Sequence, residues 1–231
     1  MIILYRIISL LIGYIFGLFQ TGYILGRLKG IDIRQYGSGN SGTTNASRVL
    51  GKKAGIMVYI GDCLKAIICC TLIRVLFHAI APDMVGLLVL YAGFGVVIGH
   101  NYPFYMNFKG GKGIAATSGA VIAFGDWRII VICLAVFIIV VLSTRYMSIA
   151  SLCVVTTYLL TTILFGQFNH IGLYGSYVHA DHLLECYIVA LAFTASAFFS
   201  HRENIKRLLN GTERRLGDPK EDVHLDEEKP Q

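Results

Sequence analysis

Charge is scarce in most of this 231-residue chain. Only 34 residues are charged, and fifteen of them lie in the last 31 positions, which leaves 19 among the first 200. An ordinary soluble domain of that length would carry roughly 50, because about a quarter of its residues are charged. A conventional soluble protein is therefore excluded for residues 1–200, and so is intrinsic disorder, because the segment is far too apolar.

The chain also lacks the patterns that indicate metal, disulfide or nucleic-acid chemistry. None of its six cysteines forms a C-x-x-C pair, and all of them lie in apolar runs, where a cysteine is usually a small buried side chain. Neither a sheet pattern with interleaved aromatic residues nor a zinc-ligand spacing is present. We therefore expect no metal, no cofactor and no nucleic-acid partner.

What the sequence does contain is long apolar runs. They predict an all-α membrane protein with about seven transmembrane helices. The predicted spans are residues 7–26, 55–80, 84–100, 113–125, 128–143, 147–168 and 183–200. The fourth and fifth are short for a hydrocarbon core of roughly 30 Å. If that pair were re-entrant, the count would fall to five and the sides of the other segments would not change.

Positive charge predicts the orientation of these spans. Sixteen of the 20 Lys and Arg residues lie in four segments that would share one side of the membrane, namely 27–54, 101–112, 144–146 and 201–231. Basic loops stay cytoplasmic, so we expect the N-terminus outside and the C-terminus inside. Residues 1–213 would form a membrane domain with cytoplasmic loops 27–54, 101–113 and 201–213, and the acidic tail 214–231 would be disordered.

The first of these loops has the composition of an anion site. Its glycines match G-x-G-x-x-G, but no strand precedes them, so a dinucleotide site is rejected. Closely spaced glycines still let backbone N–H groups converge on an anion, and a guanidinium suits phosphate. A flexible basic loop is the alternative. The candidate residues are Gly37, Ser38, Gly39, Asn40, Thr44, Asn45 and Arg48.

The second loop places glycines and a lysine before an apolar helix. Lys109 to Gly113 lacks the spacing of a Walker A loop. Exposed amides, the positive end of a helix dipole and a lysine charge nevertheless favour phosphate. A lysine-flanked membrane turn is the alternative. The candidate residues are His100, Gly110, Gly111, Lys112 and Gly113.

The third segment follows the last span. His201 and Asn204 are three residues apart and would share a helix face, while Ile205, Leu208 and Leu209 form an apolar stripe. A juxtamembrane basic helix is usually a membrane anchor, but this one leaves the bilayer beside the other two loops. Apart from Arg128, which borders a loop at the start of its span, four charged residues fall inside predicted spans and are functional candidates by default: Asp62, Lys65, Arg74 and Glu185.

Taken together, the three loops resemble the bacterial membrane glycerol-3-phosphate acyltransferases that use acyl phosphate, the PlsY family. The resemblance covers about residues 1–213. It is carried by Gly37-Ser38-Gly39-Asn40 with Thr44, Asn45, Arg48 and Gly51; by Gly99-His100, Pro103 and Phe108 to Gly113; and by His201, Asn204, Arg207-Leu208 and Gly211-Thr212-Glu213.

The resemblance implies transfer of a fatty acyl group from acyl phosphate to the sn-1 hydroxyl of glycerol 3-phosphate. The product would be lysophosphatidic acid, in the first acylation step of phospholipid synthesis. It also implies a place in the bacterial cytoplasmic (inner) membrane, contact with membrane lipid, and a hand-over of donor from an acyl-phosphate-forming enzyme.

The resemblance assigns roles residue by residue. It implies catalytic roles for Ser38, Arg48, Lys112, His201 and Asn204, and a structural brace at Glu213. It implies substrate binding by Gly37, Gly39, Asn40, Thr44, Asn45, His100, Gly110, Gly111 and Gly113.

Several alternatives stay open at this point. The proton acceptor is either His201 or, as we favour, the acceptor's own phosphate. Ser38 is either a nucleophile or a hydrogen-bond donor. An organophosphate transporter would also need positive helix ends and glycine loops, and a relative that uses acyl-CoA is a third reading.

Overall fold

The computed structural model describes residues 1–168, 171–173 and 176–218. Most of the tail 214–231, for which we predict disorder, lies outside the described residues. The described part is dominated by helices, which confirms the predicted all-α membrane class. Its ten α-helices are α1 Ile2–Gly17, α2 Thr21–Leu28, α3 Thr43–Val49, α4 Lys52–His78, α5 Val85–Asn101, α6 Ile114–Phe124, α7 Trp127–Thr144, α8 Met147–Gln167, α9 Leu183–Ser200 and α10 Arg202–Leu209.

Two short strands lie between α8 and α9. β1 (Gly172–Leu173) pairs antiparallel with β2 (Ser176–Tyr177), with Gly172 opposite Tyr177. The backbone N–H of Gly172 donates to the side chain of Asp126, the residue that caps the beginning of α7. This hairpin therefore covers the turn between α6 and α7 at the end of the bundle away from the polar loops.

Six helical segments of the described chain are long and apolar enough to cross a membrane. α6 has only 11 residues, or about 16 Å at 1.5 Å per residue, whereas the 18 residues of α7 reach about 27 Å. A short turn at Gly125 and Asp126 joins them. The beginning of α6 therefore stops about 10 Å short of the far end of α7.

The expected first span, 7–26, is not one continuous helix. α1 ends at Gly17 and α2 begins at Thr21. The buried Gln20 side chain occupies this break and donates to the carbonyls of Gly17 and His100. No proline marks the site, so a run of apolar letters could not reveal it. A helix that breaks inside the membrane needs such hydrogen-bond donors for the carbonyls that the break leaves free.

α1 and α5 are in unusually close contact because each carries two glycines four residues apart. A Cβ at Gly13 would lie 2.1 Å from the carbonyl oxygen of Ala92, and one at Gly99 would lie 2.2 Å from the backbone carbonyl oxygen of Tyr14. Small residues at this spacing let helix backbones approach in membranes. This contact fixes the end of α1 against the end of α5, where His100 lies.

We expect Gly99→Leu to destabilise the fold severely. The new side chain has no space between the two backbones, so the helices must separate, at a cost of about 3 kcal/mol or more. Thermal unfolding in detergent measures the effect. The control is Ile15→Leu on the exposed face of α1, which should change stability by less than about 0.5 kcal/mol. Equal melting temperatures for the two variants would contradict this packing.

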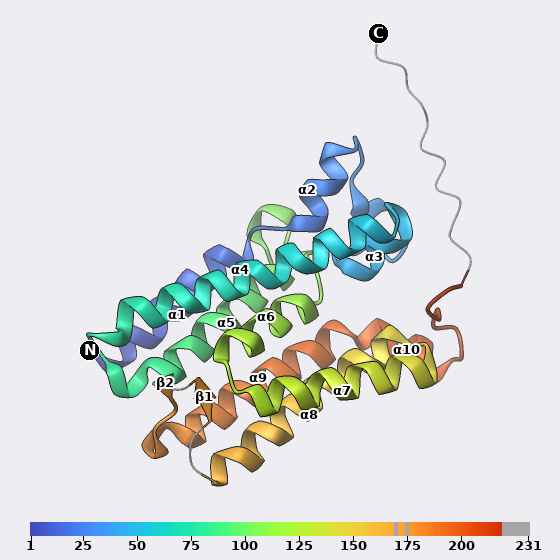
Figure 1. The fold of residues 1–231 in the computed structure, drawn as a ribbon. Coiled ribbons are helices and arrows are strands. Elements are labelled where there is room, and N and C mark those ends of the chain that lie inside the picture. The colour runs from blue at the N-terminus through green and yellow to red at the C-terminus, as the bar shows by residue number, and fades with distance from the viewer. Residues whose placement is uncertain (169–170, 174–175, 219–231) are drawn as a thin grey trace.

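The polar segments gather at one end of the bundle (Figure 1). α2, α3 and α10 lie there, whereas the N-terminus and the β-hairpin lie at the opposite end. α4 packs against α5 and α6, and α7 packs against α8, which in turn contacts α9. Three loops that are remote in sequence thus meet between two groups of helices.

Candidate active site

The first polar loop is organised around the side chain of Asn45. Its Oδ1 accepts a hydrogen bond from the Ser38 backbone N–H (2.7 Å), and its Nδ2 donates to the carbonyls of Ile33 and Tyr36 (both 3.1 Å). Gly37 has φ +63°, and a Cβ there would lie 2.3 Å from Asn45 Oδ1. The Asn45 amide is fully used in shaping this loop, so its geometry favours positioning Ser38 over contacting a substrate.

The first loop is also tied to the glycine loop. Asn40 Nδ2 donates to the Gly110 carbonyl (3.2 Å), and Asn40 Oδ1 accepts from the Gly42 N–H (2.9 Å). Side chains are excluded at the glycines themselves. A Cβ at Gly110 would lie 2.0 Å from the His100 carbonyl oxygen, and one at Gly111 would lie 1.9 Å from His100 Nε2. The chain is therefore pressed against His100 just before Lys112.

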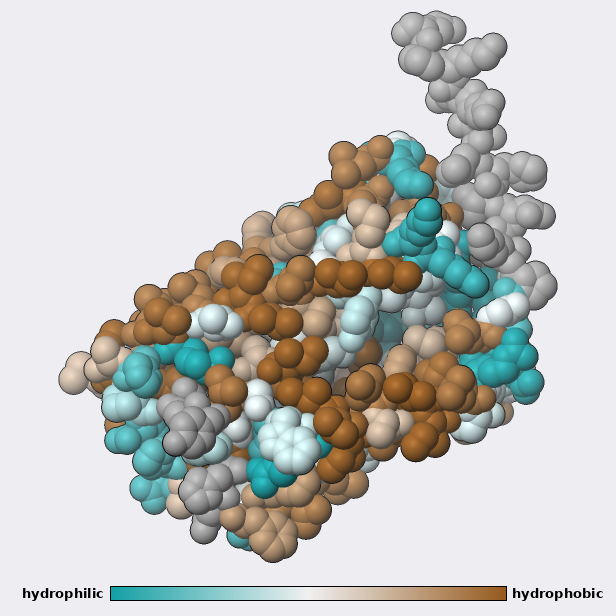
Figure 2. Space-filling view, in the orientation of Figure 1, coloured by the Kyte–Doolittle hydropathy of each residue, from teal (hydrophilic) through white to brown (hydrophobic). Residues whose placement is uncertain are grey.

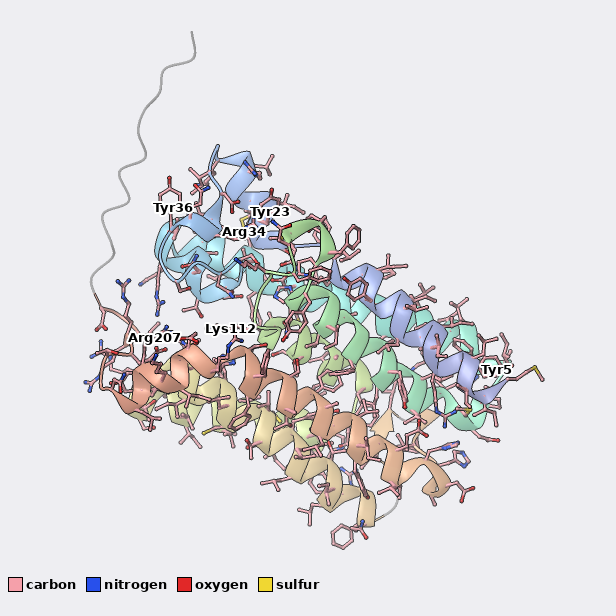
Figure 3. All side chains as sticks on the ribbon, turned by 180° about the vertical axis from the view of Figure 1, so that it is seen from behind. Tyr5, Tyr23, Arg34, Tyr36, Lys112 and Arg207 are labelled. Carbon is pink, nitrogen blue, oxygen red and sulfur yellow. The ribbon has the colours of Figure 1, made fainter. Side chains whose placement is uncertain are left out.

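Lys112 leads into a chain of polar contacts with the third segment. Its Nζ donates to Asn204 Oδ1, and Asn204 Nδ2 donates to Glu213 Oε1 (2.7 Å). The second oxygen of Glu213 accepts from Arg207 Nε (2.7 Å). Glu213 thus holds two groups at once, which fits the bracing role that the resemblance implies. Figure 3 shows Lys112 and Arg207 at the same end of the molecule, opposite Tyr5.

His201 lies where α9 meets α10 and is 3% exposed. Its Nδ1 lies 2.8 Å from the Ala197 carbonyl oxygen. A carbonyl only accepts, so the neutral ring carries its hydrogen on Nδ1 and leaves a lone pair on Nε2. Burial, together with the nearby charge of Lys112, lowers the pKa of His201 to about 4. The ring is therefore neutral at pH 7 and a weak base.

These segments enclose a single cavity of about 560 Å³. Figure 2 shows a hollow on this face, with hydrophilic residues inside it and hydrophobic residues around its mouth. The predicted site residues that line the cavity are Ser38, Asn40, Thr44, Asn45, Arg48, His100, Lys112, Gly113, His201, Asn204 and Glu213. Gly37, Gly39, Gly110 and Gly111 do not line it, and they shape the loops behind it.

Positive charge dominates the polar end. Burial, followed by the charges of Arg214 and Arg207, lowers the pKa of Arg48. Burial, followed by the charge of Arg207, lowers the pKa of Lys112 to about 8. Four basic groups thus act on one another around the carboxylate of Glu213. A bound dianion would relieve this repulsion.

The lowered pKa of Lys112 predicts a pH dependence. The ammonium is present below about pH 8 and is lost above it, so kcat/KM for a phosphorylated substrate should fall above that pH. Bound phosphate favours the protonated lysine, and the corresponding limb of kcat should therefore lie at higher pH. Steady-state rates across pH measure both limbs. Replacement of Lys112 should abolish the limb, and an unchanged limb in that variant would contradict the assignment.

Sequence reasoning missed several polar residues of the cavity wall, of which Thr43 and Arg214 lie beside predicted site residues. The hydroxyl of Thr43 is buried and has no hydrogen-bond partner among the described residues. Arg214 lines the cavity immediately after the last residue of the third motif. Thr43 precedes Thr44 in the glycine-rich loop, so only the fold distinguishes them. Among residues 1–168, 171–173 and 176–218, no three His, Cys, Asp or Glu side chains are grouped to hold a metal ion.

The fold and the site together define a class of protein, namely a multi-pass membrane protein whose cavity has basic residues from polar loops and apolar residues from helices in its lining. A family model described as glycerol-3-phosphate acyltransferase matches residues 7–211. A protein of that name from Clostridioides difficile is 42% identical over 93% of this chain and 97% of its own length. The one from Bacillus subtilis is 39% identical over 88% and 94%.

Two solved structures are similar as well. PlsY (YgiH), an integral membrane glycerol 3-phosphate acyltransferase, matches in its glycerol 3-phosphate form with a TM-score of 0.73 and 32% identity, over 93% of this chain and 95% of that one. Its lysophosphatidic acid form matches with a TM-score of 0.72. The chain therefore belongs to the glycerol-3-phosphate acyltransferase family of PlsY, whose members are integral proteins of the bacterial cytoplasmic (inner) membrane.

Proposed function

We propose that this acyltransferase moves a fatty acyl group from acyl phosphate to the sn-1 hydroxyl of glycerol 3-phosphate. The products are lysophosphatidic acid and inorganic phosphate. The observation that supports this proposal is one cavity with two unlike ends, a cationic end formed by three loops and an apolar end among the helices. An acyl phosphate has the same two parts, and so does the product.

The polar end matches the charge of the substrates. Donor and acceptor each carry a phosphate group, and the basic side chains Arg48, Lys112, Arg207 and Arg214 lie around the carboxylate of Glu213. Arg48 and Lys112 offer a guanidinium fork and an ammonium point charge, which suit phosphate in different ways. Both lie in half-buried positions, where charge interactions are stronger than in water.

The apolar end suits an acyl chain. Its lining includes Ile56 and Tyr59 of α4, Ile122 of α6, and Leu134 and Phe137 of α7. Ile56, Ile122 and Leu134 are each at least 43% exposed, so this wall opens on the outer surface of the helices. In a membrane that surface faces lipid. An acyl chain that moves from the lipid into the groove therefore stays in apolar surroundings.

The chemistry needs no covalent enzyme intermediate. The sn-1 oxygen attacks the acyl carbonyl carbon, a new ester C–O bond forms, and the C–O bond to the donor's phosphate breaks. Phosphate departs with the electron pair, and the hydroxyl proton moves to the acceptor's own phosphate. Lys112, Arg48 and the loop amides stabilise the negative charge that develops on the carbonyl oxygen and the leaving group. The Ser38 hydroxyl serves as a hydrogen-bond donor.

His201 is the competing proton acceptor, and its lowered pKa argues against that role. A base with a pKa of about 4 is poorly matched to proton removal at neutral pH. We expect His201→Gln to retain kcat within about tenfold of the wild type, since loss of an obligatory general base costs 10²–10⁴-fold. Single-turnover rates at saturating substrate measure this. A loss of about 10³-fold would instead make His201 the base.

A donor comparison tests the proposed function directly. Purified protein in detergent should form lysophosphatidic acid from acyl phosphate and glycerol 3-phosphate without an ion gradient. Acyl-CoA should give no product, and mass spectrometry should find no acyl group on Ser38. Product from acyl-CoA alone would replace the donor assignment. Uptake of labelled glycerol 3-phosphate into proteoliposomes, without product, would support a transporter and overturn the proposal.

We further propose that the polar end faces the cytoplasm, with the N-terminus outside. The basic loops that surround the cavity support this orientation. A cytoplasmic site would receive acyl phosphate from the enzyme that forms it.

A further inference from the structure

A buried charged network lies behind the glycine loop, at the break between α1 and α2. Asp62 and Lys65 of α4 and His100 of α5 are each at most 6% exposed. Burying charges at this depth is costly unless they are paired and hydrogen-bonded. The roles proposed above for the cavity residues do not account for this network.

Lys65 is the centre of the network. Its Nζ lies 2.9 Å from Asp62 Oδ1 and 2.8 Å from His100 Nδ1. It also donates to the carbonyls of Phe19 (2.5 Å) and Gly17 (3.3 Å), which the helix break leaves free. Thr21 Oγ1, at the start of α2, donates to Asp62 Oδ1 (3.1 Å). One ammonium group therefore joins the broken helix to both α4 and α5.

His100 connects Lys65 to the glycine loop. A lysine ammonium only donates, so Nδ1 of the neutral ring accepts and Nε2 carries the hydrogen. The ring lies directly against Gly111, where a Cβ would be 1.9 Å from Nε2. The Gly111 N–H donates to the His100 carbonyl (3.0 Å), which also accepts from Gln20 Nε2 (2.9 Å). The next residue along the chain is Lys112.

We infer that Asp62, Lys65 and His100 are positioning residues that hold the glycine loop so that Lys112 meets the phosphate of glycerol 3-phosphate. The inference rests on the proposed function for the identity of that ligand. Asp62 and His100 reach the wall of the cavity, so the network joins the site directly. A shift of the loop by about 1 Å is enough to cost on the order of 10²-fold in catalysis.

The chain offers a matched control for a merely structural role. Arg6 of α1 forms an ion pair with Glu185 of α9, and Tyr91 Oη donates to the same carboxylate (2.6 Å). This group also joins three helices by a charged pair, but neither Arg6 nor Glu185 lines the cavity. Breaking it should lower stability and leave the site unchanged.

The test compares two double variants, each of which removes both charges of a pair. Lys65→Met/Asp62→Leu leaves no unpaired buried charge, a change that folds often tolerate. Glycerol 3-phosphate binding is measured by calorimetry in detergent, and KM and kcat are measured with acyl phosphate. We expect Kd and KM for glycerol 3-phosphate to rise about 10- to 100-fold, with a smaller fall in kcat. Arg6→Met/Glu185→Leu should keep wild-type Kd and KM.

Each outcome has a meaning. Wild-type Kd and KM in the Lys65/Asp62 variant, with only a lower melting temperature, would overturn the inference. If that variant does not fold, Lys65→Met/Asp62→Asn takes its place under the same criterion, because it also removes both charges and the hydrogen bond to His100 while keeping an acceptor for Thr21 Oγ1. Wild-type protein that binds glycerol 3-phosphate but does not use acyl phosphate would overturn the donor assignment alone. Wild-type protein that does not bind glycerol 3-phosphate would overturn the proposed function and this inference with it.

Discussion

Lys112→Met is expected to lower kcat/KM by about 10³-fold, since one preorganised group at a developing charge contributes 10²–10³ in other enzymes. Lys112 begins the contact chain to Asn204 and Glu213 and lies at the inner end of the glycine loop. Burial also makes its charge costly, and this cost is recovered only when an anion arrives. The loss should appear in both kcat and KM, because both substrate and transition state carry phosphate charge.

Lys109→Met is the matched control for this prediction. It removes the same charge from the same loop three residues earlier, where the side chain is exposed. We expect rates within about twofold of the wild type, because exposed charges are screened by solvent and salt. Steady-state kinetics at several salt concentrations measure both variants. Equal losses in the two would mean that the loop acts through its overall charge and that Lys112 has no specific role.

Arg48→Ala is expected to lower kcat/KM by about 10²- to 10³-fold while leaving the fold intact or more stable. Among the described residues, Arg48 forms neither a hydrogen bond nor an ion pair, yet it lines the cavity. Burial and two neighbouring guanidinium groups disfavour its charge in the empty site. A buried charge that lowers the stability of the empty protein, and that a bound anion would compensate, is typical of a functional site.

Two further variants sharpen this second prediction. Arg48→Lys should recover little, because an ammonium cannot reproduce the two parallel hydrogen bonds of a guanidinium. Lys52→Ala, at the exposed beginning of α4, should behave as the wild type. Kinetics combined with melting temperatures in detergent measure the outcome. A fall in both activity and melting temperature for Arg48→Ala would indicate that Arg48 stabilises the loop and contacts no substrate.

Much of the architecture could be predicted from composition because lipid imposes simple rules. The scarcity of charge before His201 and the lengths of the apolar runs were enough for the membrane class. Glycine spacing identified the polar loops, and the fold brings Ser38, Lys112 and Asn204 to one cavity. Hydropathy could not reveal the break after Gly17, because that break depends on partners from α4 and α5.

Tertiary contacts decided which hydrogen bonds each polar side chain of the site makes. Asn45 and Asn40 look alike in the sequence, yet the first has every amide atom engaged in its own loop and the second reaches across to Gly110. Thr43 and Thr44 are neighbours, and only the fold leaves the hydroxyl of Thr43 buried without a partner among the described residues. Hydrogen-bond partners come from remote segments, so no local pattern specifies them.

The amino-acid sequence alone thus established a membrane protein and predicted three polar loops near one surface, two of them with the composition of a phosphate site, since charge scarcity and glycine spacing are local properties. The tertiary structure alone decided how those loops are held. Asp62 and Lys65 read as an ordinary intrahelical pair, and His100 as an isolated histidine. The close approach of α1 and α5 through their glycines brings the three together under Gly111. Because separate helices meet there, the buried ammonium of Lys65 gains partners from each of them, and we infer that this network holds the glycine loop in place.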